Sequence, residues 1–402
     1  MKFNKWTVAL AATGVVSLAS AVQADESHPV NTALSSTTLS GYVDTSAIWN
    51  FGSGAEVANR FANTASDRQD GFNVNTVKIQ LEKPIDEGTW SAGYKFETMF
   101  GPDAAVMPGR IADGIAIKQA YAALRAPIGN GIDFKLGQFD PIVGYEVTDS
   151  YANPNFSRSL GFNNLEPFGH TGILASYQVN DIVGISAGIA NGDVNGLNGG
   201  GGFSKANNPV DTTTLRSALA ESSKVYMGSV VIKAPESTGW LAGSSLYVGA
   251  VNGDMNGDAT GKKNDPTLLY VGASLATPIK ELSIGASADM LFNAASTAAG
   301  DKSYANAYAF YTGYQITEKL KANNRFEYAT SGYGAFMPNR TNGEGDKIIG
   351  ETFTLDYALW ANVLTRGEFR WDRAVDGVAK GAGPFNGERN DLSLTASVIY
   401  KF

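Results

Sequence analysis

Apolar and polar residues alternate with a period of two along most of the chain, and few stretches show the pattern of an amphipathic helix. In the stretch 76–82, Val77 and Ile79 share one face, whereas Lys78 and Gln80 share the other. Alternation of this kind predicts a strand with one apolar and one polar face. The sequence therefore predicts a chain built of two-faced strands.

About sixteen such strands can be placed, an even number in the range of bacterial outer-membrane barrels. They are expected near residues 39–50, 72–83, 89–100, 114–126, 132–140, 168–178, 182–190, 224–234, 240–251, 267–276, 281–292, 303–315, 319–330, 347–357, 361–372 and 391–402. The connections between them alternate between short turns and long segments rich in Gly, Asn, Asp and Pro. We therefore predict an all-β fold, a transmembrane antiparallel β-barrel with short periplasmic turns, long external loops and both termini in the periplasm.

Two further observations favour a barrel that spans a membrane. The five tryptophans after residue 24 all fall at or just beyond predicted strand ends, where aromatic rings lie at membrane interfaces: Trp49, Trp90, Trp240, Trp360 and Trp371. Hydrocarbon cannot satisfy backbone N–H and C=O groups, so strands can span it only in a sheet that closes without an edge. The apolar parity then faces lipid and the polar parity faces an aqueous lumen.

The first residues predict export. Residues 1–24 begin with Lys2 and Lys5, continue with a small, mostly apolar run and end in "AVQA", which is typical of a secretory signal peptide. We expect residues 25–38 to form a short N-terminal periplasmic segment and 39–402 to form the outer-membrane barrel. Removal of two lysines leaves 29 basic against 39 acidic residues, a net charge of −10, which argues against nucleic acid as a partner.

Composition and motifs argue against an enzyme or a cofactor. There is no cysteine, which excludes a thiol nucleophile, a thiolate metal site and a disulfide framework. The sequence contains two histidines and no hydrolase, zinc-protease or phosphate-binding motif. We expect no catalytic, cofactor or metal site.

Several stretches resemble the OmpL-like β-barrel porin family of bacterial outer membranes. They are "LSGYVDTSAIWNF", "KQAYAALRAP", "FKLGQFDPIVGYE", "NPNFSRS", "EPFGHTG" and "RGEFRWD", together with the C-terminal Phe402. The resemblance implies a Gram-negative outer-membrane channel, a passive porin for small hydrophilic solutes. It also implies outer-membrane lipid and the barrel-assembly machinery as partners, with Phe402 as the assembly signal. Large porins are usually trimers, so a homo-trimer is the expected assembly, although no residue pattern indicates one.

If the lumen conducts solutes, the charged residues of the polar parity are the candidate pore-lining residues. They are Lys78, Lys95, Glu97, Lys321, Arg325, Glu327, Arg366, Glu368, Arg370 and Asp372. Adjacent opposite charges can set a transverse field that filters solutes. Alternatively, they form a ladder of mutually neutralising charges that keeps the strands in register.

The third long connection, 141–167, is the candidate constriction loop, with Glu146, Asp149 and Arg158 as its charged residues. Its position resembles that of the external loop that folds inward in trimeric porins, and a surface cap is the alternative.

Two other connections carry Asn–Gly and Gly–Asp strings whose oxygen-bearing side chains are spaced as in part of a calcium loop: Asp193, Asn195, Asp254, Asn256 and Asp258. Turn chemistry explains them as well, because these pairs favour positive φ.

The alternative function is a closed or plugged outer-membrane barrel whose external loops serve adhesion or partner binding. The long glycine-rich connection 191–223 would be the natural binding segment in that case.

Overall fold

The computed structural model describes residues 30–31, 36–51, 70–86, 90–107, 109–112, 114–191, 224–253, 266–293, 304–332, 335–336, 346–375 and 388–402. The residues predicted as a signal peptide, and the five side chains considered for calcium, lie outside these ranges.

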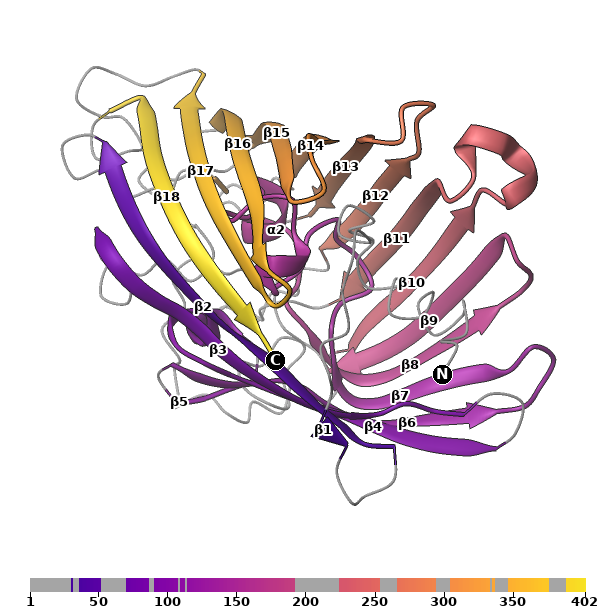
Figure 1. The fold of residues 1–402 in the computed structure, drawn as a ribbon. Helices are drawn as coiled ribbons and strands as arrows, with labels where there is room; N and C mark the ends of the chain where they lie inside the picture. The colour runs from indigo at the N-terminus through magenta and orange to yellow at the C-terminus, as the bar shows by residue number, and fades with distance from the viewer. Residues whose placement is uncertain are drawn as a thin grey trace, which may run out of the picture.

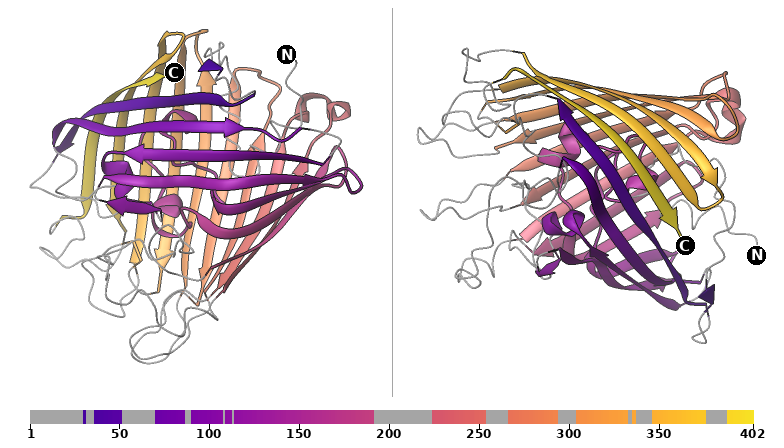
Figure 2. Two further views of the ribbon diagram at one scale, coloured as in Figure 1. Left: turned by 90° about the horizontal axis from the view of Figure 1, so that it is seen from below. Right: turned by 60° about the vertical axis from the view of Figure 1, so that its left-hand side comes forward.

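Sixteen long antiparallel strands form a closed barrel (Figures 1 and 2). Their bounds are β2 Thr38–Phe51, β3 Gly71–Lys83, β4 Ser91–Phe100, β6 Ile115–Ala126, β7 Ile132–Phe139, β8 His170–Gln178, β9 Val183–Asn191, β10 Lys224–Lys233, β11 Ser245–Gly253, β12 Thr267–Leu275, β13 Leu282–Phe292, β14 Ala305–Gln315, β15 Leu320–Ser331, β16 Asp346–Trp360, β17 Val363–Ala374 and β18 Asn390–Lys401. Each strand pairs with its neighbour in sequence, and β18 pairs with β2. The predicted sixteen-stranded antiparallel barrel is confirmed.

Two short strands extend this sheet. β1, Val30–Asn31, pairs with the start of β2, and β5, Arg110–Ala112, pairs with β6. Among the described residues, no helix is both long and apolar enough to cross a membrane.

The connections differ in length at the two ends of the barrel, as predicted. Seven connections at one end span 2–11 residues, and eight at the other end span 12–32 residues. The predicted strand start at 240 is wrong. Glu236–Leu241 form the 3-10 helix η5, in which Gly239 has φ 67°, and β11 begins only at Ser245. The positive φ of this glycine turns the chain, so Trp240 lies in a turn and not in a strand.

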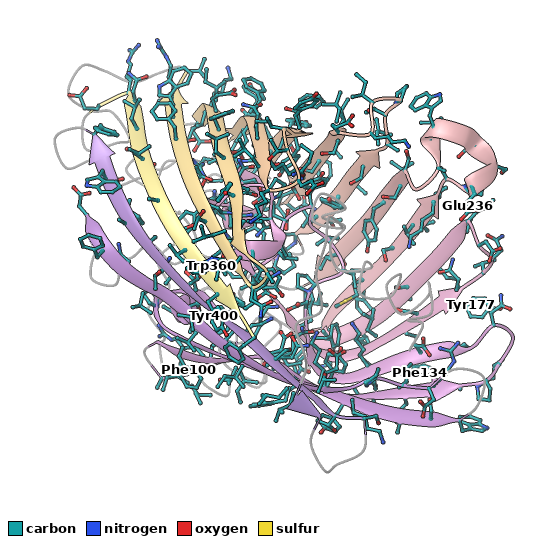
Figure 3. The ribbon with its side chains drawn as sticks, viewed as in Figure 1. Phe100, Phe134, Tyr177, Glu236, Trp360 and Tyr400 are labelled. Carbon is teal, nitrogen blue, oxygen red and sulfur yellow. The ribbon has the colours of Figure 1, made fainter. Side chains whose placement is uncertain are left out.

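The two parities of each strand have opposite environments. In β18, Leu394, Val398 and Tyr400 are 41–48% exposed on the outer surface, whereas Ser393 and Thr395 are 3–5% exposed toward the interior. Most of the large exposed apolar side chains lie on this outer surface; Figure 3 labels Phe100, Trp360 and Tyr400 among them. The outer wall is therefore an apolar band that suits lipid.

Candidate functional site in the barrel interior

The connection between β7 and β8, residues 140–169, lies inside the barrel, where its short helix α2, Leu160–Asn164, is visible within the ring of strands (Figure 1). We call these residues the inward segment. Asn153 braces its first half: the side-chain Nδ2 donates to the Val147 carbonyl at 2.7 Å, and the Oδ1 accepts from the Val147 N–H at 2.8 Å. Ser159 caps α2 by accepting from the Phe162 N–H at 3.1 Å.

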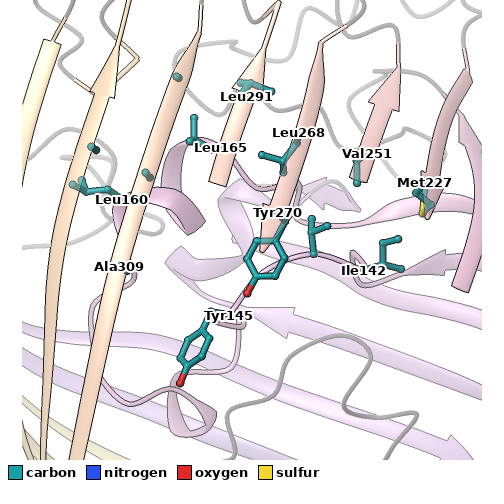
Figure 4. Close-up of a cluster of buried hydrophobic side chains, with 14 of the residues drawn as sticks. Ile142, Tyr145, Leu160, Leu165, Met227, Val251, Leu268, Tyr270, Leu291 and Ala309 are labelled. Carbon is teal, nitrogen blue, oxygen red and sulfur yellow. The ribbon is translucent and has the colours of Figure 1, made fainter. Parts of the chain in front are cut away.

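One side of the inward segment packs against an apolar part of the wall, made by the inward-facing side chains of β10 to β14 (Figure 4). Tyr145 stacks on Tyr311 of β14, with ring centroids 4.2 Å apart. The buried residues of this apolar cluster include Ile142, Val143, Leu160 and Leu165 of the segment and Met227, Val251, Leu268, Tyr270 and Leu291 of the wall. Burial of this surface stabilises the segment without fixing its exact register.

A second part of the wall, on β15 and β17, binds the segment through buried charges. Arg325 of β15 is 0% exposed, and its guanidinium lies 2.8 Å from a Glu146 carboxylate oxygen and 2.8 Å from Glu327. The same guanidinium donates to the Ser157 carbonyl at 2.7 Å. Arg325 thus joins a wall carboxylate, a segment carboxylate and the segment backbone.

Four charged residues of β15 and β17 bind the backbone of the segment. Glu368 accepts from the Phe156 and Ser157 N–H groups at 2.5 and 3.0 Å, and Glu327 accepts from the Leu160 N–H at 2.6 Å. Arg370 donates to the Arg158 carbonyl at 2.7 Å, and Arg366 donates to the Ser150 and Asn153 carbonyls, each at 2.6 Å. Buried peptide groups need partners, and here wall charges supply them.

A third part of the wall, on β3, β4 and β6, surrounds Glu97 with three ammonium groups. Lys78, Lys95 and Lys118 place their Nζ atoms 3.1–3.3 Å from the Glu97 carboxylate. Lys78 also lies 2.6 Å from Asp149 of the segment, and Lys118 lies 2.9 Å from Asp140. Two lysines therefore bridge the wall carboxylate and the carboxylates of the inward segment.

Two β-bulges create contacts in this third part. Glu97 pairs with Gln119 and Thr98 pairs with Ile117, so Lys118 is an extra residue, and Lys118 and Gln119 both reach Glu97. In β3 the register likewise skips Asn75.

The extra residue of β3 has a comparable role. The Asn75 Nδ2 donates to Asp44 at 3.0 Å, and its Oδ1 accepts from Ser46 at 3.1 Å. The second Asp44 oxygen accepts a hydrogen bond from Ser150 of the segment. This bulge therefore orients a wall carboxylate toward the inward segment.

Eleven of the thirteen candidate pore-lining and constriction residues belong to one set of contacts. Each lies in the inward segment, contacts the segment, or contacts a wall residue that binds the segment. Arg158 is buried and donates to the segment's own Val147, Thr148 and Phe156 carbonyls. Asp372 pairs with Arg370 at 2.7 Å. Lys321 and Lys95 lie apart from these contacts with the segment and are partly exposed.

Sequence reasoning missed Lys118, Asp140, Asp44 and Asn75. Lys118 and Asn75 owe their place to bulges, which period-two patterning does not reveal.

Beside the segment lies a cavity of about 720 Å³, which we call the vestibule. The vestibule is lined by side chains of β3, β4 and β6 to β9, by the short turns that join these strands and by residues 140–142. In the described part of the chain, no group of three or more His, Asp or Glu side chains is placed to bind a metal.

A closed sixteen-stranded barrel with an apolar exterior, a charged interior and an inward connection defines the class of outer-membrane channel proteins. Residues 36–402 match the family described as putative beta-barrel porin-2, OmpL-like, and the chain belongs to this family. It is accordingly an outer-membrane channel for the passive diffusion of solutes.

Solved structures share the fold at low identity. The outer-membrane channel DcaP of Acinetobacter baumannii aligns with a TM-score of 0.60 and 11% identity, over 91% of this chain and 97% of that chain. The anion-selective porin from Comamonas acidovorans gives 0.57 and 14%, over 91% and 99%. OmpF of Salmonella typhi, in complex with daunomycin, gives 0.56 and 13%, over 91% and 97%. Comparison with curated proteins gives no match.

Proposed function

We propose that small hydrophilic solutes and ions diffuse through the barrel along a path narrowed by the inward segment, without catalysis, cofactor or energy source. The observation that carries this proposal is the position of the segment. It is bound to the wall on several sides, and the vestibule of about 720 Å³ lies beside it. The inward segment is then the constriction, and the charged wall residues that bind it hold it in place.

Single-channel recording tests the proposal directly. Because the natural chain has no cysteine, one introduced thiol is the only target for a thiol reagent. Tyr151 of the segment is partly exposed, and Thr277 lies in a short turn far from it in sequence. A bulky methanethiosulfonate should reduce the conductance of Tyr151→Cys severalfold and leave that of Thr277→Cys unchanged.

Equal effects at the two positions would contradict the role of the segment. The complete absence of stepwise conductance in the unmodified protein would instead favour a plugged barrel whose loops bind a partner.

We also propose a homo-trimer, supported by a polar pair on the otherwise apolar outer face. Asn324 of β15 donates through Nδ2 to the carboxylate of Glu351 on β16. In the register, Glu351 pairs with Phe326 and Asn324 pairs with Phe353, and both phenylalanines are more than 40% exposed. An ionisable group in an apolar band faces protein more readily than lipid. The OmpT structure of Vibrio cholerae, which has the same fold, is described in a trimer form.

Mass measurement of the purified barrel in detergent would test this assembly. Glu351→Leu should shift the protein from trimer toward monomer, whereas Lys347→Leu, two steps along the same face toward the rim, should leave the trimer intact. A wild-type protein that is monomeric in mild detergent would contradict the proposal.

We further propose that Phe402 closes the barrel as well as serving as an assembly signal. Its backbone exchanges two hydrogen bonds with Gly41 of β2, at 2.9 and 3.0 Å. A Cβ added at Gly41 would lie 2.6 Å from the Phe402 ring, so the ring occupies space that only glycine leaves. Gly41→Val and deletion of Phe402 should therefore both lower the yield of folded, heat-modifiable barrel. Normal folding of both variants would contradict this closure.

A further inference from the structure

Most of the charged side chains that line the interior of the vestibule are paired with opposite charges. Lys95 lies 3.1 Å from Glu97 and 3.8 Å from Glu82. Arg125 lies 3.1 Å from Asp133, and both side chains reach the cavity. Asp140, which also lines the cavity, binds Lys118. These pairs leave little net charge for a solute to meet.

Lys135 of β7 is different. None of the carboxylates that the structure describes forms an ion pair with it, and its Nζ lies 5.1 Å from the centre of the Tyr121 ring. A tyrosine ring attracts an ammonium group through its π face, but it carries no negative charge that would pair with the ammonium as a carboxylate does. The side chain is partly exposed to the cavity, so its charge is available to a solute.

Small residues keep space open around this ammonium group. Ala123 lies opposite Lys135, and Gly137 lies opposite Tyr121 in the β6–β7 register. Gly137 has φ +132°, and a Cβ there would lie 2.3 Å from the Ala120 carbonyl oxygen. Neither position therefore extends a large side chain between Lys135 and the cavity.

Neutral hydrogen-bonding groups line the vestibule on β8, which pairs with β7, and on β9 beyond it. Ser176 of β8 and Ser186 of β9 line the cavity and share a hydrogen bond of 2.9 Å between their Oγ atoms. Gln178, next along the same face of β8, also lines it. Hydroxyl and amide groups of this kind hydrogen-bond to the hydroxyls of a solute. The cavity volume is within the usual range of small-molecule sites.

We propose that the vestibule contains a binding subsite for small hydroxylated organic anions, with Lys135 binding the anionic group and the serine pair facing the hydroxyls. This inference rests on the proposed channel function, because the subsite would load solutes onto the diffusion path. It deepens that function by assigning a preferred charge to the solute, which the negative net charge of the whole chain does not indicate.

The test uses sodium gluconate as the probe, with glucose as its uncharged counterpart, and the full barrel in detergent. Saturation-transfer NMR, which measures binding independently of conductance, should show more gluconate binding than glucose binding at equal concentration. Lys135→Met should weaken gluconate binding about tenfold, because one charged contact is lost, and Lys135→Arg should retain it. Lys83→Met, which removes the same charge near the mouth of the cavity, should change binding less than twofold.

Bilayer recording then separates the two proposals. Gluconate block that is lost in Lys135→Met and kept in Lys83→Met supports the subsite. Equal binding by wild type and Lys135→Met, in a variant that shows normal heat-modifiability, overturns the subsite even if both conduct. Lys135-dependent binding in a barrel without conductance overturns the channel proposal and leaves the subsite in place.

Discussion

The inward segment meets two kinds of wall, and they bind it by different physics. Strands β10 to β14 offer it buried apolar side chains, with Tyr270 and Leu268 at 2% and 0% exposure. Strands β15 and β17 offer Arg325 and Arg370, at 0% and 1% exposure, with carboxylates beside them. Apolar packing depends on shape and area, and a small misfit is tolerated. A buried charge tolerates no loss of its partner.

This difference indicates that the two kinds of wall have different roles in holding the segment. The apolar wall supplies attraction that is largely non-directional. The charged wall determines which backbone groups of the segment lie where, because Glu368 accepts from two consecutive N–H groups and Glu327 from a third. Four variants test this difference between the two kinds of wall.

The largest effect is expected for Arg325→Met. This change leaves Glu146 buried without its cation and leaves Glu327 with only Arg370, at 3.8 Å, and losing one partner of a buried pair costs about 3–5 kcal/mol. Urea unfolding in lipid vesicles, monitored by tryptophan fluorescence, should show a lower midpoint. If the segment is released from the wall instead, the single-channel conductance should rise. The triple variant with Glu146→Gln and Glu327→Gln should recover part of the loss. A cost below about 1 kcal/mol would contradict the role assigned to this cluster.

Asp149→Asn should have the second largest effect, about 1.5–3 kcal/mol, the range for a hydrogen bond to a charged group. Burial acts to raise the pKa of Asp149, but the Lys118 and Lys78 ammonium groups lower it below its ordinary value of 3.8. A depressed folded-state pKa means that the stabilisation is fully present above about pH 4 and is lost as the pH falls through the lower folded value. Conductance is recorded from pH 7 to pH 3 for wild type and for Asp149→Asn, and the part of the change that only wild type shows should lie below pH 4.

Ile142→Val probes the apolar wall and should cost only about 0.5–1.5 kcal/mol, with conductance unchanged. Ile142 is 2% exposed and belongs to the apolar cluster. The same urea titration measures the stability, and single-channel recording measures the conductance. Altered conductance in Ile142→Val would show that packing also determines the register of the segment.

The smallest effect is expected for Lys95→Gln. Lys95 is a member of the same network as Lys78, but its side chain is 20% exposed, and that of Glu82 is 34% exposed. Water and salt screen this pair, and Glu97, the nearer partner of Lys95 at 3.1 Å, still keeps Lys78 and Lys118, so the expected cost is about 1 kcal/mol or less. The urea titration compares Lys95→Gln with Lys78→Gln. It shows whether the burial of the lysine or only its charge determines the loss in free energy of unfolding. Equal costs for the two variants would rule out burial as the deciding factor.

Much of the barrel can be predicted because its elements are local. Period-two alternation in 391–402 is visible without any partner strand, and the structure places Leu394 outside and Ser393 inside, as that pattern requires. The error at β11 arises where Gly239 adopts a positive φ that the alternation of its neighbours does not reveal. The charged rows on β15 and β17 are also visible in the sequence, but the contacts that bury them are not.

Local residue patterns specify the strands, the face that each strand gives to lipid and the end at which the long connections lie, because each depends on residues a few positions apart. No local pattern places residues 140–169 inside the barrel or brings Glu368 to the Phe156 N–H, 212 residues away in the chain. Such a contact depends on closure of the whole barrel. Bulges at Asn75 and Lys118 likewise exist only relative to a partner strand, so no periodicity within one strand specifies them.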